Sequence, residues 1–232
     1  MKTIIAEKPS VAREIARIVK ADRREIGYLT GNGYNVTWAY GHLVQPALPD
    51  GYGIKGFHRD NLPIIPPVFQ LVPRQVRTEK GYKTDNDVVA QIKIIAKLFR
   101  ESERIIVATD AGREGELIFR YLYEYIGCAT PFDRLWISSL TDKAIKEGLQ
   151  KLESGSKYDN LYYAAKARSE ADWLVGINAT RLFSVLYHRT LNVGRVVSPT
   201  LAILVQREAE IGAFKPEPFY TAELNFGDFD AA

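Results

Sequence analysis

The chain has 232 residues, of which 46% are hydrophobic and 25% are charged, and this composition predicts a soluble, globular protein with one large or two small domains. A single cysteine and three scattered histidines leave no spacing for an internal disulfide or a zinc site, and no segment has the length of a membrane span or the pattern of a signal peptide. The net charge of +3 is too small to indicate a nucleic-acid partner by itself, so such a partner must be argued from local groups of residues.

The first predicted element is a strand at residues 3–6, which leads through Glu7 and Lys8 into a helix with apolar periodicity, and Ser10 is its predicted N-cap. An irregular, proline-containing stretch follows at about 44–84. The apolar run 105–107 predicts another strand, which delivers the residues ATDAGREGE at 108–116 to the start of a second helix. We therefore expect two strand-to-helix junctions that both carry carboxylates.

The carboxylates at these two junctions are expected to meet. Glu7 and Asp110 each follow a strand, and the carboxyl ends of neighbouring parallel strands share one edge of a sheet. Glu114 and Glu116 open the second helix, so three carboxylates can converge with Lys8 beside them, as in sites for Mg²⁺ and phosphate. The alternative is structural, because acidic residues in a first helical turn are stabilised by the helix dipole whether or not they bind anything.

The second half of the chain is predicted to be mainly helical. Thr141 is expected to cap a helix, a short linker is expected at 154–156, and Ser198 is the predicted N-cap of a later helix. Several basic residues lie among aromatic ones, as in a groove for single-stranded nucleic acid: Lys166, Arg168, Arg181, Arg189 and Arg195. Arg168 and Asp172 share one helix face, and the alternative to a role in DNA binding is an exposed ion pair between them. The alternative for the aromatic residues is packing in the core.

Several stretches of this sequence resemble one known family. The strand-end Glu7 and the turn with Asp110 and Glu114 resemble the Toprim domain of topoisomerases and primases. Further stretches resemble the type IA DNA topoisomerases, and within them the topoisomerase III branch: AEKPS at 6–10, GHL at 41–43, ATDAGREGELIFR at 108–120, LWISSLT at 135–141, ARSEADWLVGINATR at 167–181 and VGRVVSPTLAILVQRE at 193–208.

The resemblance implies an α/β fold, in which a central, mostly parallel sheet is flanked by helices. We expect a Toprim domain at 1–152 with a family-specific insertion at about 44–84, followed by a helical DNA-binding segment at 153–213. Residues 214–232 are expected to begin a truncated β-containing domain, with a strand in the alternating pattern of 216–226. The chain is thus expected to be the amino-terminal part of a longer enzyme.

The resemblance also implies a reaction. Type IA topoisomerases cut, pass and reseal single DNA strands through a 5′-phosphotyrosine, with Mg²⁺ and without ATP. The nucleophilic tyrosine belongs to a later domain, and the sequence from Tyr187 to Thr190 lacks the proline of the family's nucleophile motif, so we assign it to packing or DNA contact. The expected partners are single-stranded DNA, the remaining carboxy-terminal domains and, by resemblance, a helicase. The expected location is the cytoplasm, at the nucleoid and away from membranes.

The resemblance assigns roles to particular residues. Glu7 is expected to transfer protons at the leaving 3′-oxygen, and Lys8 to stabilise the scissile phosphate. The expected Mg²⁺ ligands are Glu7, Asp110 and Glu114. The expected DNA contacts are Arg168, Asp172, Arg181 and Arg195, and the further candidates are His42, Arg113 and Glu116. Gly112 stands where the family's motif has a second aspartate, which leaves the number of metal ions open.

Two other functions remain open at this stage. A Toprim nuclease or a primase-like phosphotransferase would share Glu7, Asp110 and Glu114 but use water or a nucleotide hydroxyl, and the stretches at 167–208 argue against it. A nonenzymatic DNA-binding module would bind DNA through its basic residues and would catalyse no reaction. On the topoisomerase interpretation, this chain alone is expected not to cleave DNA.

Overall fold

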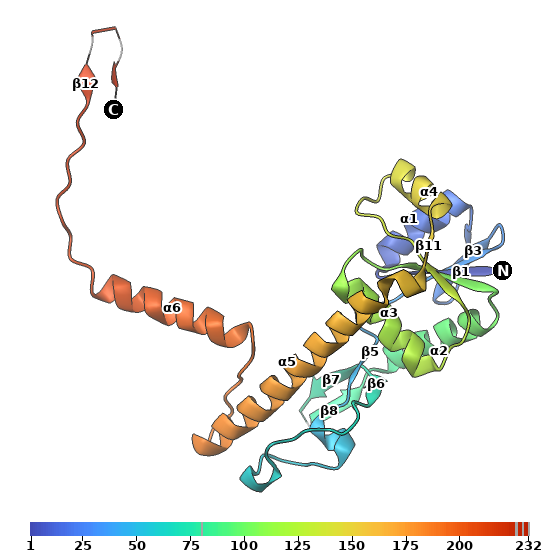
Figure 1. The fold of residues 1–232 in the computed structure, drawn as a ribbon, viewed down its shortest axis with the longest axis horizontal. Coiled ribbons are helices and arrows are strands. Elements are labelled where there is room, and N and C mark those ends of the chain that lie inside the picture. The colour runs from blue at the N-terminus through green and yellow to red at the C-terminus, as the bar shows by residue number, and fades with distance from the viewer. Residues whose placement is uncertain (80, 226, 229, 232) are drawn as a thin grey trace.

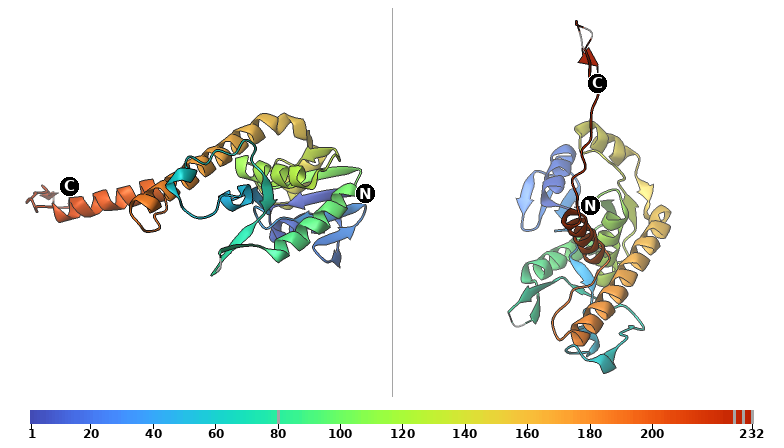
Figure 2. Two further views of the ribbon diagram at one scale, coloured as in Figure 1. Left: turned by 90° about the horizontal axis from the view of Figure 1, so that it is seen from below. Right: turned by 90° about the vertical axis from the view of Figure 1, so that its left-hand side faces the viewer.

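The computed structural model describes residues 1–79, 81–225, 227–228 and 230–231. Figure 1 shows an α/β body that contains the amino terminus, a long helix α5 that runs away from this body, and a further helix α6 that leads to an extended tail. The left view in Figure 2 shows α6 and the tail beyond the body, and in the right view α6 projects toward the viewer in front of the body.

The body is built on a seven-stranded sheet with β1 at its centre. The strands in spatial order are β11 (Glu153–Ser154), β10 (Phe132–Arg134), β9 (Arg104–Ala108), β1 (Lys2–Ala6), β4 (Tyr34–Trp38), β3 (Tyr28–Gly31) and β2 (Arg23–Glu25). β10, β9, β1 and β4 are parallel, and the outer strands β11, β3 and β2 pair antiparallel. The expected fold class, a mostly parallel sheet flanked by helices, is confirmed.

Alternation along the central strands produces two cores, one on each face of the sheet. Ile5 points to the face covered by α2 (Asn86–Arg100) and α3 (Arg113–Ile126). Ile4 points to the other face, which is covered by α1 (Pro9–Val19) and α4 (Asp142–Gln150). Strands buried on both faces have continuous apolar runs, which is why the run 105–107 indicates this strand in the sequence.

The stretch at 44–84 lies between β4 and α2 and is more regular than expected. β5 (Val44–Pro46) pairs antiparallel with β6 (Leu71–Pro73), and β7 (Gln75–Thr78) pairs antiparallel with β8 (Gly81–Thr84). Two short 3₁₀ helices lie between β5 and β6: η1 (Pro49–Tyr52) and η2 (Arg59–Asn61). The many prolines of this stretch hid these short strands from a pattern-based prediction.

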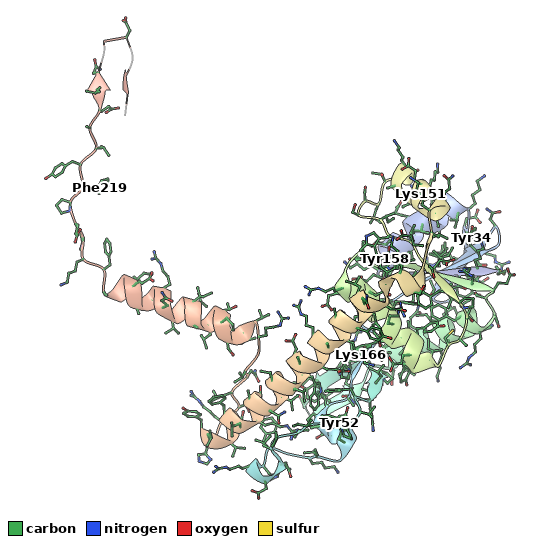
Figure 3. All side chains as sticks on the ribbon, viewed as in Figure 1. Tyr34, Tyr52, Lys151, Tyr158, Lys166 and Phe219 are labelled. Atoms are coloured by element: carbon green, nitrogen blue, oxygen red, sulfur yellow. The ribbon has the colours of Figure 1, made fainter. Side chains whose placement is uncertain are left out.

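Helix α5 (Asp159–Leu186) connects the body to the 44–84 stretch. Near its beginning Tyr162 and Ala165 pack into the core beside α3. Farther along, the Trp173 indole donates a hydrogen bond to the Ala47 carbonyl at 3.0 Å and packs edge-on against Tyr52, which Figure 3 labels beside this half of α5. The helix is therefore held at both ends by different parts of the chain.

The linker expected at 154–156 is not present, and this prediction was wrong. Ser154 belongs to β11, and η3 (Gly155–Tyr158) leads directly into α5. Gly155 is buried so closely that a Cβ placed on it would lie 2.0 Å from the Phe132 ring. Small residues here allow close packing and do not provide a hinge.

Both serines predicted as N-caps lie inside their helices instead. α1 begins at Pro9 with Lys8 as its N-cap residue, because proline at the first helical position needs no hydrogen bond to its nitrogen and already has a helical φ. α6 (Val197–Gly212) begins before Ser198, whose hydroxyl accepts a hydrogen bond from the Gly194 N–H at 3.2 Å. The prediction for Thr141 is confirmed, since its side chain accepts from the Ala144 N–H.

The tail contains less strand than the sequence pattern indicated. β12 (Leu224–Asn225) pairs with β13 (Asp230–Ala231), whereas the residues before it, including the exposed Phe219 labelled in Figure 3, are extended without strand pairing. Phe226, the last residue of the expected strand, lies outside the described residues. Within the described part of the chain, no helix is both long and apolar enough to cross a membrane.

Candidate metal and nucleic-acid site

The two strand-to-helix junctions meet at the carboxyl edge of the sheet. β1 and β9 are parallel neighbours with Ala6 opposite Ala108, so the residues that follow each strand emerge side by side. The Asp110 backbone N–H donates a hydrogen bond to the Glu7 carboxylate at 3.2 Å. The Lys8 ammonium lies 4.0 Å from the Asp110 carboxylate. Glu7, Lys8 and Asp110 therefore lie together at this edge of the sheet.

A third carboxylate and a histidine lie at the same edge. Glu114 is in the first turn of α3 and is exposed, and its carboxylate lies 3.4 Å from Nε2 of His42. His42 follows β4, and the neighbouring Gly41 N–H donates to the backbone carbonyl of Glu7 at 3.4 Å. Arg113 is exposed at the first position of α3. The loop after β4 thus joins the edge formed by β1 and β9.

Close packing shapes the turn between β9 and α3. A Cβ placed on Gly115 would lie 2.1 Å from the Asp110 carbonyl oxygen, so only glycine fits there. The Thr109 hydroxyl donates to the Gly115 carbonyl at 2.7 Å, and the Gly112 N–H donates to the Asp110 carbonyl at 2.9 Å. Gly112 itself is extended, with φ −179°, and a Cβ placed on it would meet nothing within 4 Å.

Oxygen ligands of this kind suit Mg²⁺, which takes one or two carboxylates and keeps several waters. Glu7 and Asp110 supply such a pair at the exposed end of the strands. As the side chains stand, no three His, Cys, Asp or Glu residues in the described part of the chain form a complete metal cluster. The residues therefore fit a site with few protein ligands better than a closed cage of ligands.

Glu116, a further candidate in the sequence, faces away from this edge. Its carboxylate is fully buried, and it accepts hydrogen bonds from Arg120 at 2.8 Å and from Arg134 at 3.0 Å. Both oxygens are thus held by arginines beneath the turn, and we withdraw Glu116 as a metal ligand. Sequence reasoning missed Arg134, since nothing in a three-residue strand indicates that its last residue is a fully buried arginine.

A cluster of charges lies on α5 and the segment after it. Asp172 accepts two hydrogen bonds from Nε of Arg195, at 2.8 and 3.0 Å, and lies 4.0 Å from Nε of Arg168. Asp172 raises the pKa of Arg195 through its hydrogen bonds and charge, and Glu114 adds to the shift in the same direction. The shared helix face of Arg168 and Asp172 is as expected, whereas their contact with Arg195 could not be read from sequence.

Arg181 does not belong to this exposed cluster. It is only 6% exposed, donates to the Gly56 carbonyl at 2.6 Å and lies 4.9 Å from the centre of the Phe57 ring. Its burial lowers its pKa, because the charged form loses solvation. Arg181 thus joins α5 to the 44–84 stretch, where the two line a groove of about 700 Å³, and we withdraw it as a direct DNA contact.

Comparison with known families agrees with this geometry. The family model described as the Toprim domain matches residues 2–140, and the family model described as DNA topoisomerase matches residues 156–232. The solved structure of full-length topoisomerase I from Thermotoga maritima has the same fold, with a TM-score of 0.59 and 23% identity over 93% of this chain and 31% of that one. The chain therefore belongs to the type IA DNA topoisomerases that contain a Toprim domain.

Similar sequences give the branch within that family. DNA topoisomerase 3 from Bacillus subtilis is 49% identical over 94% of this chain and 29% of its own length. DNA topoisomerase 3 from Staphylococcus epidermidis is 46% identical over 98% of this chain and 31% of its own length. The branch is topoisomerase III, and the chain spans less than a third of the length of these relatives.

Proposed function

We propose that this chain supplies the metal and acid–base site, and part of the single-stranded DNA groove, of a topoisomerase III that cuts, passes and reseals single DNA strands through a 5′-phosphotyrosine. The observation that carries the proposal is the hydrogen bond from the Asp110 backbone to the Glu7 carboxylate beside Lys8. It ties the Asp110 backbone to the Glu7 carboxylate, with the Lys8 ammonium 4.0 Å from the Asp110 carboxylate, at the edge where α/β sheets hold their ligands.

The proposed roles follow from the chemistry of these side chains. The Glu7 carboxyl would hold the proton that passes to and from the leaving 3′-oxygen, which requires a carboxyl group within hydrogen-bond reach. The Lys8 ammonium would stabilise the charge on the scissile phosphate. Glu7 and Asp110, with Glu114 nearby, would hold Mg²⁺ in a reaction without ATP. When bound, this ion orients the 3′-hydroxyl for resealing.

The number of ligands supports one Mg²⁺ ion. The carboxylates of Glu7 and Asp110, which follow neighbouring strands, would satisfy the coordination that Mg²⁺ requires together with retained waters and a DNA phosphate. Gly112 offers no oxygen from a side chain at the position where the family's motif has another aspartate. Glu114 is exposed in the first turn of α3 and lies beside His42, so it and His42 are placed to contact waters or the DNA backbone.

The DNA strand is proposed to pass over Arg168 and Arg195 toward the carboxylate edge. Both guanidinium groups are partly exposed and carry the positive charge that phosphates require. Asp172 lies between them and fixes their spacing, so its proposed role is to orient the arginines. Binding to DNA would place the protein at the nucleoid in the cytoplasm, and a helicase partner is proposed by family resemblance alone.

We propose that the nucleophilic tyrosine lies outside these 232 residues and that the chain alone does not cleave DNA. Tyr187 is exposed at the end of α5 and stacks on Phe183. We further propose the division into a Toprim domain at 1–152, a helical DNA-binding segment at 153–213 and the beginning of a β-containing domain at 214–232. The family match at 156–232 argues against a Toprim nuclease or primase.

The metal site is tested by the variant Asp110→Asn. We expect Mg²⁺ to raise the melting temperature of the wild-type chain, because a ligand that binds only the folded state stabilises it. Asp110→Asn should abolish this shift while binding of single-stranded DNA without Mg²⁺ persists. The matched control is Asp60→Asn, which removes an exposed carboxylate in η2 and should leave the shift intact. An undiminished shift in Asp110→Asn would move the metal elsewhere.

A further inference from the structure

Arg134 is a fully buried arginine directly beneath the carboxylate edge. It ends β10, and its guanidinium donates hydrogen bonds to three backbone carbonyls at the end of β9. The distances are 3.0 Å to Val107, 2.7 Å to Thr109 and 2.7 Å to Asp110. Its Nε donates to Glu116 of α3 at 3.0 Å. One side chain thus ties together β10, β9 and α3.

These contacts satisfy backbone carbonyl groups that have no partner in the sheet. The chain leaves the sheet after Ala108, so the carbonyls of residues 109 and 110 lose their strand partners, although Thr109 is still buried. A planar guanidinium can donate to several carbonyls at once, which a lysine ammonium cannot do in the same geometry. The buried charge is in turn neutralised by the buried Glu116 carboxylate.

The consequence is that the Asp110 peptide is fixed on both sides. Its carbonyl accepts from Arg134 and from the Gly112 N–H, and its N–H donates to Glu7. Neither Glu7 nor Asp110 can shift without breaking a bond in this chain of contacts. We propose that Arg134 is a positioning residue that holds Asp110 against Glu7 in the geometry used for Mg²⁺, an inference that rests on the function proposed above for these two carboxylates.

Arg120 provides a natural comparison, because it binds the other oxygen of the same Glu116 carboxylate. Its guanidinium contacts the Gly155 carbonyl at 2.9 Å and Asp159 at 2.6 Å, at the beginning of α5. Its hydrogen bonds go to Glu116, Gly155 and Asp159, and none of these three reaches the turn at 109–112. Both arginines therefore stabilise the same buried acid, but only Arg134 reaches the turn that carries Asp110.

The test compares Arg134→Lys with Arg120→Lys. Each variant keeps a positive charge beside Glu116 and removes one guanidinium fork. Two quantities are measured on the whole chain: hydrogen exchange of the Asp110 amide by NMR, without metal, and Mg²⁺ affinity by calorimetry. We expect Arg134→Lys to speed exchange of this amide about tenfold and to weaken Mg²⁺ binding about 10- to 100-fold, as loss of a group that orients a ligand does. Arg120→Lys should change neither quantity.

Each outcome decides the role of Arg134. If both quantities in Arg134→Lys match those in Arg120→Lys, Arg134 is merely structural and the inference fails. If Arg134→Lys does not fold, the pair Arg134→Met and Glu116→Met replaces the buried ions with apolar side chains, and normal Asp110 exchange in that variant overturns the inference. If Asp110 exchange responds to Arg134→Lys alone but the wild-type chain binds no Mg²⁺, the positioning role stands and the proposed metal site fails.

Discussion

At the scale of single residues, Gly112 and Gly115 belong to the same turn but have opposite surroundings. Gly115 lies against the Asp110 carbonyl, so any side chain there would displace the peptide that carries Asp110. Gly112 is extended and open, so a side chain there would point into free space. Only the glycine at 115 is required by packing, and the glycine at 112 is free to vary without cost to the fold.

The variant Gly112→Asp is therefore predicted to fold normally and to bind Mg²⁺ more tightly than the wild-type chain, by roughly tenfold, because an added carboxylate increases the ligand charge. Calorimetric titration with Mg²⁺ measures the change. Gly115→Ala is the contrasting variant, and we expect it to lower stability by about 1–3 kcal/mol through overpacking and to weaken Mg²⁺ binding. Equal Mg²⁺ affinity in Gly112→Asp and wild type would place the metal away from this turn.

The sequence predicted the residues at the carboxylate edge, but it could not show which of the nearby acidic and basic residues are exposed and which are buried. Glu7 and Asp110 follow recognisable apolar strands, and strand adjacency brought them together as predicted. Glu116 lies two residues from Glu114, so the sequence alone gives both the same helix-start pattern, yet one is exposed and the other fully buried. Arg181 resembled its basic neighbours for the same reason, because burial depends on contacts that are distant in the sequence.

At the scale of elements, the beginning of α5 is held by polar and aromatic contacts of the residues just before it. Tyr158 in η3 stacks on Trp136, with ring centres 4.7 Å apart, and its hydroxyl donates to Glu153 in β11. Burial and this hydrogen bond raise the pKa of Tyr158 to about 12. The segment predicted to be a linker is thus one of the places that fix α5 to the sheet, because glycine and serine serve close packing as well as flexibility.

These contacts predict a pH dependence of stability. The ordinary pKa of tyrosine is 10.0 and that of folded Tyr158 is about 12, so the unfolded chain releases this proton first. The contribution of Tyr158 is fully present below pH 10 and is lost as the pH rises through 12. Urea unfolding at several alkaline pH values should show a smaller loss of stability in Tyr158→Phe than in the wild type. Parallel pH curves for the two proteins would contradict this assignment.

At the scale of the whole molecule, α5 and the segment after it bring together charges that are far apart in the chain. Its first half packs beside α3, and the segment that follows α5 returns Arg195 to Asp172, 23 residues earlier in the chain. Helical periodicity predicted a mainly helical second half and the shared face of Arg168 and Asp172. The return of Arg195 depends on the path of the segment between α5 and α6, for which no local pattern exists in the sequence.

This arrangement predicts how DNA binding responds to salt. Arg168→Ala and Arg195→Ala should each weaken binding of single-stranded DNA and reduce the slope of log affinity against log salt by about 0.7, the value for one lost phosphate contact. Arg100→Ala is the matched control, because it removes one exposed arginine at the end of α2, outside the cluster and outside residues 153–213. Affinities measured between low and moderate salt give the slopes. Equal slopes in all the variants would remove the cluster from the DNA path.

The central claim is that the chain binds single-stranded DNA and holds the metal site but lacks the nucleophile. The most direct measurement incubates the chain with end-labelled single-stranded DNA and Mg²⁺, and then compares a native gel with a denaturing gel of the same samples. We predict retention of DNA on the native gel and intact, unattached DNA on the denaturing gel. Nicked DNA or a covalent adduct would show a complete active site within these residues, and DNA that is not retained would contradict the proposed groove.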